Sequence, residues 1–140
     1  MKILITGCRG QLGTELQHQL SAEGCAIGPL PERLRKATVI PVDVDELDIT
    51  DREATINYIR RHQPDTVINC AAFTNVDGCE TARDAAFKVN AIGPRNLALA
   101  GLAAAYSALV TGSTLQLSPA PCMMAQAKSY QLQMPLPVQW

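Results

Sequence analysis

The chain has 140 residues, 47% of them hydrophobic, which is enough to bury the core of one domain. With a formal net charge of −1 and scattered Lys and Arg residues, it offers no basic stripe for nucleic acid and no polybasic surface for anionic lipid. No apolar stretch is as long as a membrane span, and the apolar run after Lys2 is too short for a signal peptide.

A buried strand and a glycine-rich turn open the chain. The apolar run Ile3-Leu4-Ile5 predicts a strand from Lys2 to Thr6, and Thr6-Gly7-Cys8-Arg9-Gly10-Gln11-Leu12-Gly13 follows it directly. Glycines at this spacing let the backbone turn tightly and approach a phosphate, and the N–H groups of a helix start bind anions. The motif predicts a pyrophosphate site. An ordinary strand–helix turn is the alternative, because the spacing differs from GxGxxG.

A helix and a second strand are expected next. The helix ends near Gly24, and its apolar stripe consists of Leu12, Leu16 and Leu20. Gly28 to Lys36 is expected to be a loop, after which Thr38 to Val42 forms a strand that ends at Asp43.

A capping box marks the following helix. Thr50-Asp51-Arg52-Glu53 has the pattern in which a Thr hydroxyl and a Glu carboxylate each accept a backbone N–H bond at a helix start. It predicts a helix from Asp51 to about Gln63, with Ile56 and Ile59 facing inward. The third strand, Thr66 to Asn69, is apolar enough to be buried.

The pattern fades toward the C-terminus. Helices are expected over Thr81 to Ala91 and Pro94 to Ala105, with a kink or break at Gly93-Pro94 between them, and Leu109 to Thr111 is the candidate for a fourth strand. Residues 115–140, rich in proline and glutamine, show no helical or strand period. The prediction is an α/β domain in residues 1–114, an incomplete, doubly wound parallel sheet, followed by an irregular tail in 115–140.

Cysteine usage indicates a reducing compartment. The five cysteines are odd in number and contain no CxxC pair, so neither a disulfide framework nor a zinc site is indicated; they are Cys8, Cys25, Cys70, Cys79 and Cys122. We therefore expect a cytoplasmic protein without a metal site that acts on a small molecule.

Four segments resemble one enzyme family. They are Thr6–Gly13, Val42–Asp51, Pro64–Asp77, which contains Asn-x-Ala-Ala-x-Thr-x-Val-Asp, and Val89–Ala98, which contains Val-Asn-x-x-Gly-Pro-Arg-Asn. In these segments the chain resembles the N-terminal half of the extended short-chain dehydrogenase/reductases, most closely the dTDP-4-dehydrorhamnose reductases. The resemblance covers about the first hundred residues. It implies a Rossmann-like fold.

The resemblance also implies a set of cofactor-binding residues. Backbone groups of the glycine segment would contact the pyrophosphate, with two flanking glycines shaping the turn; the residues concerned are Gly10, Gln11 and Leu12, and Gly7 and Gly13. Asp48 and Ile49 would lie beside the adenine, and Asp43 is a candidate for the ribose. The segment under the ribose and nicotinamide would be Ala71, Ala72, Phe73 and Thr74. Asn90 would hold neighbouring backbone in place.

The cofactor implied is NADPH, with NADH as the alternative. A 2′-phosphate needs a nearby cation, and Arg9 in the glycine turn or Arg33, Arg35 and Lys36 in the next loop could supply one. Solvated surface charge is the alternative role for these side chains.

In the resembled enzymes a hydride passes from the nicotinamide to the C4 ketone of dTDP-4-dehydro-L-rhamnose, giving dTDP-L-rhamnose for polysaccharide. A Tyr donates the proton, and a Lys four residues later lowers its pKa. Here the residues four positions after Tyr58, Tyr106 and Tyr130 are His62, Val110 and Met134. The one matching catalytic position is Thr114, which would orient the ketone. The chain is therefore expected to be inactive alone, and a truncated or frame-shifted reductase gene would explain the loss of pattern.

Two other functions remain open. One is a non-catalytic, dinucleotide-binding regulatory protein, and the other is a fragment of a sugar-nucleotide epimerase or dehydratase. The partner expected from the resemblance is a nucleotide-sugar substrate, with a homodimer as one oligomeric state and with neither nucleic acid nor membrane as a partner.

Overall fold

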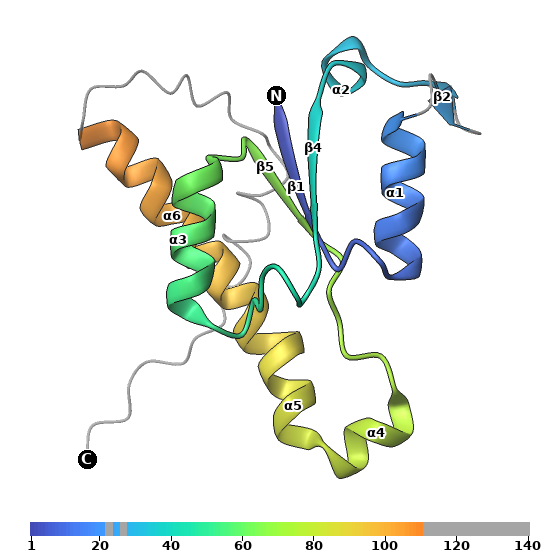
Figure 1. Cartoon of the computed structure of the whole chain (residues 1–140), viewed down its shortest axis with the longest axis vertical. Helices are drawn as coiled ribbons and strands as arrows, with labels where there is room; N and C mark the ends of the chain where they lie inside the picture. Colours follow the sequence, from blue (N-terminus) through green and yellow to red (C-terminus); the bar gives the residue numbers. More distant parts are fainter. Residues whose placement is uncertain (22–23, 26–27, 111–140) are drawn as a thin grey trace, which may run out of the picture.

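A three-stranded parallel sheet forms the centre of the protein. The computed structural model describes residues 1–21, 24–25 and 28–110. Strands β1 (Lys2–Thr6), β4 (Thr38–Val42) and β5 (Thr66–Asn69) pair in the order β4-β1-β5 (Figure 1). Their bounds agree with those predicted from the apolar runs. Thr6 pairs with Val42 on one side and Asn69 on the other, so all three strands end at one edge of the sheet.

Helices cover both faces of this sheet. The connection from β1 to β4 contains α1 (Gln11–Ser21), and that from β4 to β5 contains α3 (Arg52–His62). The first connection runs from the central strand to one edge of the sheet, and the second runs back across the sheet to the other edge. Because such crossovers are right-handed, connections in opposite directions place their helices on opposite faces. Figure 1 shows α1 on one side and α3 with α6 (Gly93–Val110) on the other. The predicted doubly wound α/β arrangement is confirmed.

The main core lies between the sheet and the α3–α6 layer. Its buried members are Leu4, Val42, Leu47, Ile49, Ile59, Leu97 and Ala100. Ile3 and Ile5 alternate with Leu4 and are equally buried, as expected of a central strand covered on both faces. Of the predicted stripe on α1, Leu16 and Leu20 are half-buried, whereas Leu12 is 60% exposed.

The segment predicted as a loop before β4 contains short elements. Two-residue strands β2 (Gly24–Cys25) and β3 (Gly28–Pro29) pair antiparallel, and α2 (Glu32–Arg35) forms one helical turn. The helical turn is supported by an ion pair of 2.6 Å between Lys36 Nζ and Glu32 Oε1, four residues apart. The sequence did not predict this helical turn, because the two prolines just before it favour a loop.

The cap of α3 differs from the predicted capping box. Asp51, not Thr50, is the N-cap, and its Oδ1 accepts a hydrogen bond of 3.0 Å from the N–H of Ala54. Either residue type can cap a helix, and the choice depends on which one has extended backbone. The helix ends at His62, and its C-cap residue, Gln63, is left-handed with φ of 48°.

The region after β5 is helical over more of its length than predicted, although Ala82 interrupts the helix expected over Thr81 to Ala91. Its elements are α4 (Val76–Thr81), α5 (Arg83–Phe87), the π-helical turn η1 (Lys88–Ile92) and α6. No break occurs at Gly93-Pro94, because the π-helical turn η1 passes directly into α6. A π-turn next to a proline is one way in which a helix accommodates the missing N–H. The expected fourth strand was also wrong for Leu109 and Val110, which end α6, while Thr111 lies outside the described residues. No helix within the described ranges is long and apolar enough to cross a membrane.

Candidate functional site: the glycine loop at the carboxyl edge of the sheet

The loop from β1 to α1 is a tight turn built on glycine. Gly7 has φ of 63°, in the left-handed region that other residues rarely adopt. Gly10 donates a hydrogen bond of 3.1 Å to the Gly7 carbonyl, and Thr14 donates one of 2.9 Å to the Gly10 carbonyl, which starts α1. The chain thus passes from strand to helix within four residues.

Two of these glycines are required by close approach. A Cβ on Gly7 would lie 2.6 Å from the backbone N of Ala71, in the segment that follows β5. A Cβ on Gly13 would overlap the carbonyl oxygen of Gly7. The loop is therefore packed against both the next strand end and its own helix. An ordinary turn would not require both contacts.

The N-terminus of α1 is open to a ligand. Gln11 and Leu12 are exposed in the first turn, where N–H groups have no acceptor within the helix. The helix dipole adds a partial positive charge there. An anion such as a diphosphate therefore finds donors and favourable charge at the place predicted for it.

Asp43, at the end of β4, is bound to the glycine loop. Its two carboxylate oxygens each accept a 2.9 Å hydrogen bond, one from the N–H of Arg9 and one from that of Val44. These two bonds, the first above all, hold the pKa of Asp43 below its ordinary value. Asp43 thus positions the loop, and a carboxylate oxygen can accept further bonds from a ribose.

The guanidinium of Arg9 extends over the turn after β4. Its Nη1 lies 2.6 Å from Asp45 Oδ2, and its Nη2 lies 3.4 Å from Glu46 Oε1. The hydrogen bond to Asp45 and the charge of that carboxylate raise the pKa of Arg9. Glu46 also accepts a hydrogen bond from the N–H of Asp43, at 3.0 Å, which ties this turn to the strand.

Helix α6 holds the segment predicted to lie beside the adenine. The buried Asn96 side chain donates hydrogen bonds to the carbonyls of Ile49 and Thr50, at 3.0 and 3.1 Å. Gly93 leaves room for Ile49, whose Cδ1 would lie 2.5 Å from a Cβ at that position. Ile49 itself is a core residue, 5% exposed, so an adenine contact there would use its backbone. Asp48 is exposed.

The segment after β5 is held from two sides. Asn90 Oδ1 accepts a hydrogen bond of 2.8 Å from the N–H of Phe73, and its Nδ2 donates one of 3.0 Å to the carbonyl of the same residue. At the strand end, Asn69 Oδ1 accepts bonds from Thr6 Oγ1, at 2.6 Å, and from Ala71 N, at 3.2 Å. Ala72 and Thr74 stay exposed at this edge. The geometry agrees with the positioning role expected of Asn90.

Three of the four cations considered for a 2′-phosphate lie at the wrong end of the sheet. Arg33, Arg35 and Lys36 precede β4, whereas the glycine loop meets its carboxyl end (Figure 1). A five-residue strand at roughly 3.3 Å per residue separates the two ends by about 16 Å. Arg9 alone of this set is at the carboxyl edge.

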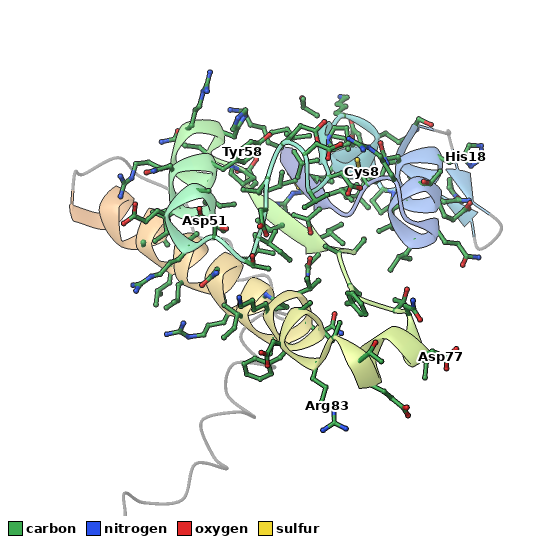
Figure 2. All side chains as sticks on the ribbon, turned by 60° about the horizontal axis from the view of Figure 1, so that its bottom comes forward. Cys8, His18, Asp51, Tyr58, Asp77 and Arg83 are labelled. Carbon is green, nitrogen blue, oxygen red and sulfur yellow. The ribbon has the colours of Figure 1, made fainter. Side chains whose placement is uncertain are left out.

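Catalytic side chains are not brought together by the described residues. Thr114 lies outside them. Tyr58 projects from α3, where its ring stacks on His62 with centroids 4.2 Å apart and burial raises its pKa, while Cys8 lies at the glycine loop (Figure 2). Burial, followed by the charge of Asp43, likewise raises the pKa of the Cys8 thiol, which disfavours a thiolate nucleophile. Over the same ranges, no group of three or more His, Cys, Asp or Glu is placed to hold a metal.

The positioning roles of Asn69 and Asn96 were missed from sequence. Asn96 lies in an alanine-rich helical run, where an amide side chain between apolar neighbours is the available signal of a buried hydrogen bond. Asn69 ends an apolar strand and gives no such signal.

Comparison with known proteins shows which family the chain is similar to. The family model described as the RmlD substrate binding domain matches residues 1–117. A dTDP-4-dehydrorhamnose reductase of Mycobacterium tuberculosis is 39% identical over 99 residues, which are 71% of this chain and 28% of that protein. The chain spans less than a third of the length of the curated relatives that match it first.

Solved structures agree. A dTDP-4-dehydrorhamnose reductase of Clostridium acetobutylicum is 47% identical with a TM-score of 0.64, covering 74% of this chain and 33% of that one. The corresponding enzyme of Bacillus anthracis, solved in complex with NADP, is 35% identical with a TM-score of 0.62, over the same shares of the two chains.

Proposed function

The chain belongs to the family of the RmlD substrate binding domain, and on that premise we propose that its residues 1–114 are the cofactor-binding unit of an NADPH-dependent dTDP-4-dehydrorhamnose reductase. Such an enzyme reduces dTDP-4-dehydro-L-rhamnose to dTDP-L-rhamnose. NADH is the alternative cofactor. A cytoplasmic location and a homodimer remain predictions from the sequence.

The glycine loop is the observation that carries this proposal. Gly7 brings the loop within backbone contact of Ala71, so the start of α1 and the end of β5 form one surface. In doubly wound sheets a dinucleotide binds at the carboxyl edge where the strand order reverses. Here that point lies between β1 and β5. The pyrophosphate would rest on Gly10, Gln11 and Leu12.

The remaining cofactor residues follow from the same placement. Asp43 would reach the adenosine ribose, and backbone near Asp48 and Ile49 would flank the adenine. Ala71 to Thr74 would pass under the second ribose and the nicotinamide, with Asn90 and Asn96 fixing the two segments. Bound there, the nicotinamide would supply hydride.

Turnover also needs a proton donor for the ketone oxygen. None of the three tyrosines of the chain is followed by Lys four residues later. We therefore expect the 140-residue chain to bind NADPH and to reduce the sugar nucleotide poorly, with Thr114 as the one catalytic position retained. The same observation favours a second candidate function, a non-catalytic dinucleotide-binding protein.

Titration of the wild-type chain with NADPH tests the proposal, and two variants are then titrated in the same way. Leu12→Asp places a carboxylate where the pyrophosphate would lie, and since Leu12 is 60% exposed the fold should survive. We expect binding to weaken at least about tenfold from like-charge repulsion. Leu102→Asp, at a site 69% exposed on α6, is the matched control and should bind normally.

One outcome would refute the site that both candidate functions share, and another would decide between them. If the wild-type chain ignores NADPH and NADH, or if both variants bind equally, the glycine loop is not the site. If the chain binds NADPH and oxidises it upon addition of dTDP-4-dehydro-L-rhamnose, the non-catalytic alternative is refuted.

A further inference from the structure

One cation at the carboxyl edge is shared between the cofactor site and a pair of carboxylates. Arg9 contacts Asp45 at 2.6 Å and Glu46 at 3.4 Å, and its side chain is 58% exposed. The Asp45 side chain is 65% exposed, and among the described residues Arg9 is the one hydrogen-bond partner of its carboxylate. The contact can therefore open at little cost, because exposed ion pairs are weak.

The position of Arg9 matches the place where dinucleotides differ. In these folds a carboxylate after the second strand accepts a hydrogen bond from the ribose 2′-hydroxyl of NADH, whereas an Arg nearby accommodates the 2′-phosphate of NADPH. The N–H of Arg9 is bonded to the carboxylate of Asp43 at the end of β4. Both kinds of group are thus present at one spot: two carboxylates contact the Arg9 guanidinium, and a third, Asp43, holds the Arg9 backbone.

We propose that Asp45 sets the preference between NADPH and NADH, by competing with the 2′-phosphate for the Arg9 guanidinium. This inference rests on the proposed dinucleotide site. A phosphate monoester carries close to two negative charges, so it needs the guanidinium that Asp45 holds. The 2′-hydroxyl of NADH is neutral and gains nothing from freeing Arg9.

The test compares dissociation constants for both nucleotides, measured on the full chain by nicotinamide fluorescence. We expect Asp45→Asn to tighten NADPH about fivefold, the upper range for one exposed pair, and to leave NADH within about twofold. Arg9→Gln should weaken NADPH selectively. In the double variant the gain in NADPH affinity from Asp45→Asn should disappear, because no Arg9 guanidinium is present to be released.

A matched control removes a carboxylate from a similar ion pair elsewhere. Glu32→Gln breaks the 2.6 Å contact with Lys36 at the opposite edge of the sheet and should leave the NADPH to NADH ratio unchanged. The inference is overturned if Asp45→Asn shifts both nucleotides equally or neither, or if its gain persists without Arg9. If neither nucleotide binds the wild-type chain, the proposed function fails together with this inference.

Discussion

Replacing Gly7 with alanine tests the geometry on which the site depends. At φ of 63° an alanine adopts left-handed backbone, which costs about 1–2 kcal/mol. Its Cβ would also lie 2.6 Å from Ala71 N, 2.7 Å from Ala71 Cα and 2.8 Å from the carbonyl carbon of Cys70. All three are backbone atoms, so no flexible side chain can move aside.

The two effects add, because one acts within the residue and the other between segments. Overpacking of this kind costs typically about 1–3 kcal/mol, so Gly7→Ala should lower the free energy of unfolding by about 2–5 kcal/mol. This is a large share of the roughly 5–15 kcal/mol of a typical domain. The end of β5 should shift, and NADPH binding should weaken with it.

Urea unfolding followed by far-UV circular dichroism measures this loss, with Gly101→Ala as the control. Gly101 lies in α6, and a Cβ there would meet nothing within 4 Å. Alanine should therefore raise stability by about 0.5–1 kcal/mol through its better helix propensity. Equal stability of the two variants would refute the close contact between the glycine loop and the end of β5.

Three further changes address the supports of the site. Asn90→Ala removes both hydrogen bonds to Phe73, so NADPH titration should show weaker binding, with a loss of about 1–2 kcal/mol in urea unfolding; unchanged binding would contradict its positioning role. Asn96→Ala leaves the Thr50 carbonyl unpaired and the Ile49 carbonyl with only the 3.4 Å bond from Thr55 Oγ1, and should cost about 1–3 kcal/mol in the same assay, whereas a loss near zero would mean that water replaces the amide. The lowered pKa of Asp43 predicts stability that is complete above its unfolded value of about 3.9 and lost as pH falls through the folded value; urea midpoints measured against pH should show a flatter acid limb in Asp43→Asn.

Local patterns determined most of the framework. The strand bounds of β1, β4 and β5 follow from short apolar runs. The glycine turn could be predicted because both a left-handed backbone and close packing require glycine. The family segments could be recognised too, since each is a short continuous stretch of the chain. Ambiguity appeared where two neighbouring residues can do one task, as Thr50 and Asp51 can at the start of α3.

Only the tertiary structure decided which distant groups meet. The sequence alone offered Arg9 in the glycine turn and Arg33, Arg35 and Lys36 in the next loop as candidate cations, yet a strand's length separates Arg9 from the other three across the sheet. It could not show that Asn90 and Asn96 hold segments 17 and 47 residues away. Spacing along a chain specifies strands, helices and turns, which are local, whereas hydrogen bonds between remote segments depend on how those elements pack.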